Sequence, residues 1–371
     1  MYMAFNHFLY KRWKITLPLW SIISPLIGLI LLALAGEQGS GIFAAVMGIS
    51  LISVVLSAVH HAEVVAHKVG EPYGTLILAL AITVIEVSLI VSIMLTEVGG
   101  DSTLARDTVF AAIMLILSGI IGMSLFIGGY FYKEQAFIKQ GVSAALVTLS
   151  AISILTLVLP NYTTTEVGPV YSNSQLIFVA IISLVLYGSF VAVQTIRHRD
   201  YFLPEDAAPG DEDVHAAPPS GLTAIMSLLL LIVSLVVVVL LSKKLSPTIE
   251  SIVINLGAPK TLVGVIIAAV ILLPEGIAAI RAARQNRLQT SLNLALGSAL
   301  ASIGLTIPAV AIVCYFAGLR VTLGIDAKST LLLILSLFTI SISFNAGKTN
   351  ILQGIVLLVI LATYMFISVV P

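Results

Sequence analysis

Charged residues and cysteines are scarce in this chain of 371 residues. Asp, Glu, Lys and Arg make up 10% of it, whereas a soluble globular domain is about 25% charged. The single cysteine, Cys314, excludes an internal disulfide and a metal site built from several cysteines. The net formal charge is zero, so the charge balance predicts no nucleic-acid partner. We therefore expect neither a soluble enzyme nor a nucleic-acid-binding protein.

Long apolar runs take up most of the chain, of which 59% is hydrophobic. Runs of about 20 apolar residues are typical of transmembrane helices, and the alternating segments of a membrane β-barrel are not found. We predict an all-α integral membrane protein with about eleven transmembrane helices. In the eighth span we expect a break at Pro274, with a loop or a separate half-helix before it. The predicted spans are 15–35, 41–66, 73–97, 105–131, 139–160, 174–196, 222–242, 250–280, 290–318, 329–346 and 350–370.

Basic residues are unevenly distributed between the two sides of the predicted membrane domain. Twelve of the 18 Lys and Arg residues fall on the side of the N-terminus. Because short loops rich in Lys and Arg stay in the cytoplasm, we predict a cytoplasmic N-terminus and a periplasmic C-terminus in a bacterial inner membrane.

One long polar segment, residues 197–221, interrupts the apolar runs with six acidic residues among prolines and alanines. This composition favours a disordered cytoplasmic linker; a loop that senses divalent cations is the alternative, although its acids lack a regular ligand spacing. The predicted organisation is an N-terminal segment with the first helix (1–40), a five-helix repeat (41–196), the acidic linker (197–221) and a second five-helix repeat (222–371).

The two halves share a sequence pattern. The string Glu-x6-Gly-x-Pro begins at Glu63 and again at Glu250, and each copy leads into an apolar span that contains a glutamate, Glu86 or Glu275. Each repeat has five spans, an odd number, so the second would cross the membrane with opposite polarity. Two inverted five-helix repeats plus an extra first helix are the architecture that this pattern predicts.

Glu86 and Glu275 lie deep inside these apolar spans. A carboxylate at bilayer depth is costly unless it is protonated, paired or in contact with water or a cation. Two such residues near the pseudo-two-fold axis indicate a cation or proton pathway. A structural, protonated carboxyl bonded to a neighbour is the alternative. Pro274, which precedes Glu275, frees a backbone carbonyl one turn earlier.

Hydroxyl side chains follow one face of the ninth span, where Ser298, Ser302 and Thr306 are spaced by four residues. Hydroxyl, carbonyl and carboxylate oxygens suit hard cations. Helix–helix packing is the alternative role for this stripe, because small residues line membrane helix interfaces in general.

Three ligand-type side chains, His60, Glu63 and His67, share a face at the end of the second span. Zinc would accept them, but the His-Glu-x-x-His motif of a metalloprotease is not formed. We predict a proton path or a cytoplasmic vestibule there.

Residues 273–308, LPEGIAAIRAARQNRLQTSLNLALGSALASIGLTIP, and more loosely residues 70–90, GEPYGTLILALAITVIEVSLI, resemble a known family. The chain resembles the cation/proton exchangers of the Ca2+:cation antiporter superfamily over nearly its whole length. Within them it looks most like the bacterial antiporters that exchange calcium, or sodium and potassium, for protons. The resemblance implies two five-span repeats with an extra first span and an acidic linker.

Members of this family carry Gly-Asn-Ala-x-Glu at each buried glutamate. Here Thr83 and Leu272 stand in place of the two asparagines. One hydroxyl thus replaces two amide ligands, which leaves room for Na+ or K+ beside Ca2+. The family's Gly-Ser pair is kept in the second repeat as Gly297-Ser298. The first repeat keeps only the serine, Ser118. The predicted cation and proton ligands are Glu86, Glu275, Thr83, Ser118, Ser298 and Ser302.

The predicted function is secondary active antiport, in which Ca2+ and also Na+ or K+ leave the cytoplasm in exchange for H+. Glu86 and Glu275 would bind cation and proton alternately. A cation channel, or a monovalent cation/proton exchanger without calcium transport, is the alternative. An intramembrane hydrolase would need a nucleophile or metal triad that the sequence does not supply. We expect no cofactor besides the transported ions and a lipid bilayer as surroundings, and the sequence leaves a homo-oligomer open.

Overall fold

The computed structural model describes residues 17–35, 41–70, 73–94, 101–202, 219–255, 259 and 261–370. Within these residues, nine helices are long and apolar enough to cross a membrane, and two shorter apolar helices, Leu19–Leu34 and Ile77–Val91, accompany them. Together they match the eleven predicted spans. The predicted all-α membrane fold is confirmed.

The chain divides into two compact units, each built from two separate stretches of sequence. The smaller unit comprises Met1–Ile93 and Ala208–Ile252, and the larger one comprises Met94–Ala207 and Val253–Pro371. Each predicted repeat therefore contributes helices to both units. The linker acids from Glu205 onward and the basic residues before Leu17 lie outside the described residues.

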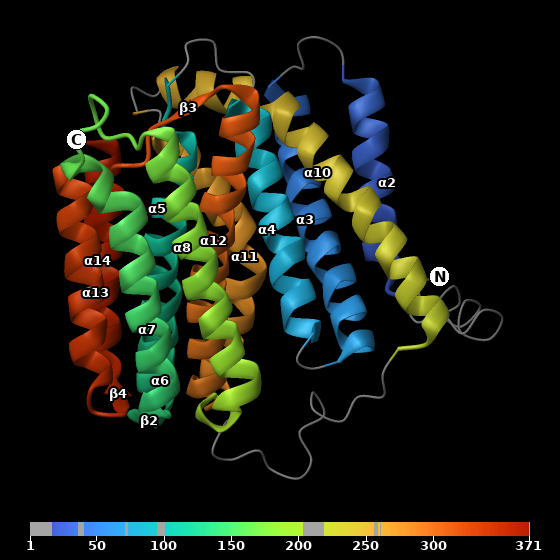
Figure 1. Cartoon of the computed structure of the whole chain (residues 1–371). Coiled ribbons are helices and arrows are strands. Elements are labelled where there is room, and N and C mark those ends of the chain that lie inside the picture. Colours follow the sequence, from blue (N-terminus) through green and yellow to red (C-terminus); the bar gives the residue numbers. More distant parts are fainter. Residues whose placement is uncertain are drawn as a thin grey trace. The chain divides into compact units, whose positions relative to one another are not determined.

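The smaller unit holds the helices before residue 94 and most of one helix from the second half (Figure 1). Hydroxyl groups join its first two helices: Ser57 Oγ donates to the Ser21 carbonyl at 2.6 Å, and the Oγ atoms of Ser24 and Ser53 are 2.7 Å apart. The helices are α2 (Leu19–Leu34), α3 (Gly41–Val69), α4 (Tyr73–Met94) and α10 (Gly221–Asn255).

The larger unit contains seven apolar spans, three before the linker and four after it. Each of the three spans before the linker includes a π-helical turn, where the hydrogen bonds reach one residue further than in an α-helix. The first three spans are α5 (Leu104–Met114) with η1 (Leu115–Ile120) and α6 (Ile121–Tyr132); α7 (Lys139–Ser153) with η2 (Ile154–Val158) and the 3-10 turn η3 (Leu159–Tyr162); and α8 (Asn173–Ala192) with η4 (Val193–Arg197) and the 3-10 turn η5 (Arg199–Tyr201). The later four are α11 (Thr261–Arg284), α12 (Leu288–Ala317), α13 (Ala327–Phe344) and α14 (Ile351–Val369).

The packing within the larger unit repeats itself. α14 lies against α6 and α8 lies against α12, and both contacts are close at a glycine. A Cβ on Gly354 of α14 would meet the backbone of Phe126 in α6, and one on Gly304 of α12 would lie 2.9 Å from Tyr187 in α8. The third span of each predicted repeat thus packs against the fifth span of the other repeat.

Short strands close both ends of the larger unit. At one end β1 (Asp101–Ser102) pairs with β3 (Arg320–Val321), and Val170 bridges to Thr322. At the other end β2 (Glu134–Ala136) pairs with β4 (Lys348–Asn350). The span α5–α6 therefore runs from the β1–β3 end to the β2–β4 end, and α12 runs the opposite way. Opposite polarity of these equivalent spans is what an inverted repeat requires.

Two predicted boundaries are wrong. The seventh helix does not stop at residue 242, because α10 continues to Asn255, and the next helix begins at Thr261. Lys243 and Lys244 are exposed on α10, and a long lysine side chain can keep its ammonium in water while its helix continues. The expected break at Pro274 is also wrong, since α11 is continuous through it.

Candidate functional site

Glu275 lies in the second half of α11, directly after the helix-internal Pro274. The residue is half-buried and its two carboxyl oxygens are shielded from solvent. The helix packs here on the π-helical turn η1, because a Cβ on Gly276 would be 3.4 Å from Ile120 Cδ1. Proline leaves the carbonyl four residues earlier, that of Val270, without its usual helical donor. A carboxylate and a helix irregularity therefore coincide inside an apolar span.

The first half of α11 is held more tightly still. A Cβ on Gly264 would lie 2.9 Å from the carbonyl carbon of Asp107 and 3.0 Å from the amide nitrogen of Thr108. Such a spacing brings the backbones of α11 and α5 into direct contact. The segment before Glu275 is thus fixed against α5.

Glu86 lies on α4, in the smaller unit, and is 2% exposed. Thr83, one turn earlier, is 5% exposed, and its hydroxyl donates to the Ala79 carbonyl at 2.8 Å. A hydroxyl that donates its only hydrogen still has oxygen lone pairs, with which it can accept a bond or coordinate a cation. Thr83 and Glu86 therefore lie about one turn apart on α4, and both side chains are buried.

The hydroxyl stripe of α12 is mostly buried. Ser302 is 6% exposed and Thr306 is fully buried, while Ser298 is half-buried. Ser291, three turns before Ser302 on the same face, donates to Ser124 Oγ of α6 at 2.9 Å. Gly304, which contacts α8, lies on the opposite face. Because α12 is one continuous helix, residues spaced by four lie along one side of it; the role of this stripe as a ligand stays a prediction.

Ser118, one of the ligands predicted from the first repeat, contacts α13. It lies in η1, is fully buried, and its Oγ is 3.2 Å from Ser336 Oγ of α13. Ser336 in turn donates to the Leu332 carbonyl at 2.8 Å. The structure therefore joins Ser118 to α13.

The three ligand-type residues of α3 are not gathered into a metal site. Glu63 and His67 are exposed, and His60 is half-buried with its ring 5.4 Å from the ring of Trp20 in α2. His61 Nε2 is 3.0 Å from the Ser21 carbonyl. Among the described residues, no group of three His, Cys, Asp or Glu side chains could hold a metal ion. The proposed proton vestibule at these residues stays a prediction.

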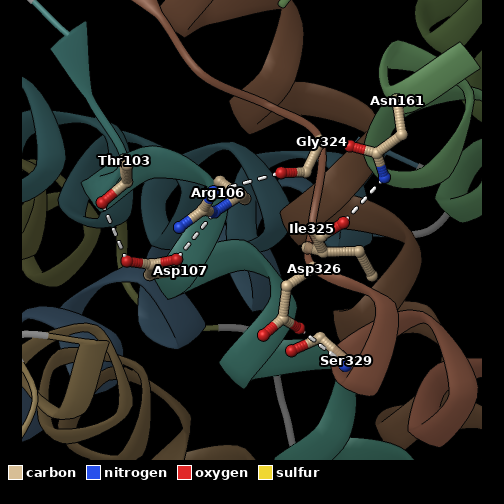
Figure 2. A network of polar contacts seen from close by, with 8 residues as sticks. All are labelled: Thr103, Arg106, Asp107, Asn161, Gly324, Ile325, Asp326 and Ser329. Carbon is tan, nitrogen blue, oxygen red and sulfur yellow. Dashed lines mark hydrogen bonds and ion pairs between the residues drawn. The ribbon is translucent and has the colours of Figure 1, made fainter. Parts of the chain in front are cut away.

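A polar network ties together the β1–β3 end of the larger unit (Figure 2). Arg106 pairs with Asp107 at 2.8 Å and donates to the Gly324 carbonyl at 3.1 Å, and Asn161 donates to the Ile325 carbonyl at 2.7 Å. The loop between α12 and α13 is thereby fixed to α5 and to the end of η3. This network borders a cavity of about 210 Å³ that also reaches Tyr364 of α14.

The Arg106–Asp107 pair is absent from the predicted site residues, although two adjacent charges at the start of an apolar span could have indicated it. Its side chains are only 17% and 12% exposed. The two opposite charges compensate each other, and the arginine also binds a carbonyl. The pair is therefore suited to holding the α12–α13 loop in place and not to binding a cation.

Comparison with known proteins shows which family the chain matches. The family model of the sodium/calcium exchanger protein matches residues 39–196 and 226–370. The chain is 43% identical to the candidate ionic transporter y4hA of Sinorhizobium fredii, over 95% of this chain and 97% of that protein. It is 35% identical to the sodium-potassium/proton antiporter ChaA of Escherichia coli, over 93% and 94% of the two chains.

The fold has a solved counterpart. The crystal structure of the Ca2+/H+ antiporter protein YfkE superposes with a TM-score of 0.71 over 95% of this chain and 98% of that one, at 17% sequence identity. The chain belongs to the sodium/calcium exchanger protein family and is a multi-pass membrane cation exchanger.

Proposed function

We propose that this protein exchanges Ca2+, and also Na+ or K+, for protons, and that Glu86 and Glu275 bind the cation and the proton alternately. The observation that carries the proposal is a shielded carboxyl group in an apolar helix of each inverted repeat. The names of its relatives agree with the ion classes, since one exchanges sodium and potassium for protons and another exchanges Ca2+ for H+.

The coupling follows from competition for the same oxygens. A carboxyl group that has taken up a proton is neutral and coordinates a cation poorly, and a carboxylate that coordinates a cation resists protonation. The carrier would then cross between its two open states with either ion but not with both. A lower pH on the side from which the cation binds should therefore weaken apparent cation affinity.

The neutral ligands of the proposed site are hydroxyl groups. Thr83 precedes one glutamate, and Ser298 and Ser302 follow the other in the next helix; Ser118 completes the set. Hydroxyl and carboxylate oxygens together accept Ca2+ as well as alkali cations. This donor set supports transport of more than one cation.

We propose further that the β2–β4 end faces the cytoplasm. In the larger unit this end collects most of the basic residues, and Asp and Glu are few there. Loops with many Lys and Arg residues remain on the cytoplasmic side, so α14 would end in the periplasm. The basic residues at this end are Lys133, Lys139, Arg197, Arg199, Arg281, Arg284, Arg287 and Lys348.

The test measures cation-driven proton flux in everted membrane vesicles. Adding Ca2+, Na+ or K+ should dissipate an imposed pH gradient with the wild type, and Glu86→Gln or Glu275→Gln should reduce this flux by about a hundredfold or more, because the amide carries no charge and takes up no proton. The matched control is Glu134→Gln, because Glu134 lies in the short strand β2 and its side chain is 64% exposed.

Each part of the proposal can fail separately. A wild type that moves no protons for any of the three cations contradicts proton antiport. Cation flux without proton movement indicates a channel. Full activity in both glutamate variants leaves antiport standing and removes these residues from the site.

A further inference from the structure

A groove runs between α7 and α13 on the surface of the larger unit, starting at the β2–β4 end. It has a volume of about 580 Å³ and is lined by one face of α7 and by the end of α13. Lys139 and Asn345 line it at the β2–β4 end, Ser341 lies one turn further along α13, and Val147 and Ser150 lie two to three turns further along α7. Val147 is 67% exposed, so this face of α7 has no covering helix among the described residues.

The length of the groove fits one leaflet of a bilayer. From Lys139 to Ser150 the helix advances eleven residues, which is about 16 Å at 1.5 Å per residue. The hydrocarbon core of a bilayer is about 30 Å thick. The groove therefore extends from the membrane surface to roughly the depth that an acyl chain reaches.

The hydroxyl groups that line the groove leave it suited to an apolar occupant. Ser150 donates to the Leu146 carbonyl and Ser341 donates to the Leu337 carbonyl, each at 2.7 Å. Because both hydroxyls are satisfied within their own helices, neither needs a polar partner in the groove. The exposed Val147 side chain adds apolar surface one turn before Ser150.

The mouth of the groove is positively charged. Lys139 Nζ donates to the Asn345 carbonyl at 2.9 Å, which holds the ammonium group at the entrance and leaves it two further hydrogens to donate. No Asp or Glu is among the described residues that line the groove. Glu134, nearby in sequence, lies 4.0 Å from Lys348 instead.

We propose that this groove binds one anionic phospholipid, with its phosphate on Lys139 and an acyl chain along Val147. The site is separate from the glutamate helices, so the proposal goes beyond ion exchange and does not depend on which ions are transported. A positive mouth above an apolar channel of one-leaflet length matches the two parts of a lipid molecule.

The test is native mass spectrometry of the full-length protein titrated with phosphatidylglycerol or phosphatidylcholine. The wild type should retain one phosphatidylglycerol more tightly than phosphatidylcholine. Lys139→Gln should weaken phosphatidylglycerol binding about fivefold, the equivalent of the roughly 1 kcal/mol that one basic residue contributes at an anionic surface. Lys133→Gln removes an exposed lysine from the same end but outside the groove, and should leave binding unchanged.

A second variant tests the acyl part. Val147→Trp should fill the groove at depth and lower binding of both lipids while Lys139 remains, and inorganic phosphate should not displace phosphatidylglycerol from the wild type. Equal binding in wild type and Lys139→Gln would overturn the proposal. Displacement by phosphate alone, or a dimer that dissociates on Val147→Trp, would also overturn it, by showing a free anion or a second copy as the occupant.

Discussion

The helices that carry the two glutamates differ in how they are supported. In α4 the residues around Glu86 are large and buried: Ile85 is 2% exposed and Leu89 3% exposed. In α11 the neighbours of Glu275 are Pro274 and Gly276, and Gly264 brings the helix onto the backbone of α5. Large side chains flank Glu86, whereas Glu275 lies between a proline and a glycine on a helix that contacts α5 through backbone.

This difference shows which features the two repeats share. Both keep a carboxyl group out of water in an apolar helix, which is what competition between cation and proton needs. The means of excluding water is free to diverge, because bulky side chains and close backbone packing both do so. α11 should consequently tolerate changes of residue size less well than α4, and it should depend on its helix irregularity.

The largest effect is expected at Gly264. In Gly264→Val the new side chain would meet the backbone of Asp107 and Thr108, which cannot move aside as a flexible side chain can. We expect a destabilisation of about 1–3 kcal/mol, seen as a lower unfolding temperature in detergent, together with a loss of transport in vesicles.

The control is Gly188→Val in α8, where a Cβ would have no atom within 4 Å. It should unfold close to the wild-type temperature. If Gly264→Val does the same and still transports, then close backbone packing is not what distinguishes α11 from α4.

A smaller effect is expected at Pro274. Pro274→Ala restores a backbone donor that can bond to the Val270 carbonyl. If that carbonyl helps to bind the cation, its loss should raise the cation concentration for half-maximal proton flux by about tenfold, since a hydrogen bond to a charged group contributes about 1.5–3 kcal/mol. The protein should fold at least as well as the wild type, because alanine favours a helix.

Pro25→Ala, in the interior of α2, is the matched proline replacement in a helix that carries neither glutamate. It should leave the half-maximal concentration unchanged. An equal change in the two variants would mean that Pro274 acts on the fold in general and not on the cation.

Sequence reasoning was sufficient for the number of spans and for their polarity in the larger unit, because an apolar run of membrane length has few other structures open to it. It failed where the helix continues through residues that usually end one. Lys243 and Lys244 suggested a loop, and Pro274 suggested a break, but α10 and α11 pass through both places. The helices can continue because neighbouring helices support them and because the lysine ammonium groups reach water. A single segment of sequence shows neither of these conditions.

The direction of individual ligands was harder to predict. The face of Ser298 and Ser302 follows from regular helical spacing, since α12 has no π turn. Ser118 lies inside η1, where one extra residue per turn shifts the helical phase of everything beyond it. Its contact with Ser336 therefore could not be read from spacing within its own span.

The smallest effect tests the difference in ligands between the two glutamate helices. Thr83 supplies a hydroxyl one turn before Glu86, whereas the matching Leu272 is apolar and 5% exposed. Thr83→Val keeps the shape of the side chain and removes its oxygen. The half-maximal concentrations of Ca2+ and K+ should therefore rise about fivefold, as expected for one lost neutral ligand of about 1 kcal/mol.

Leu272→Thr adds an oxygen in the other repeat and should favour Ca2+ over K+, because Ca2+ takes six to eight oxygen ligands. Proton flux driven by each cation in vesicles measures both changes. Unaltered half-maximal concentrations in Thr83→Val would remove this hydroxyl from the site, and a Leu272→Thr variant without a change in selectivity would show that the repeats differ in support but not in how they select the cation.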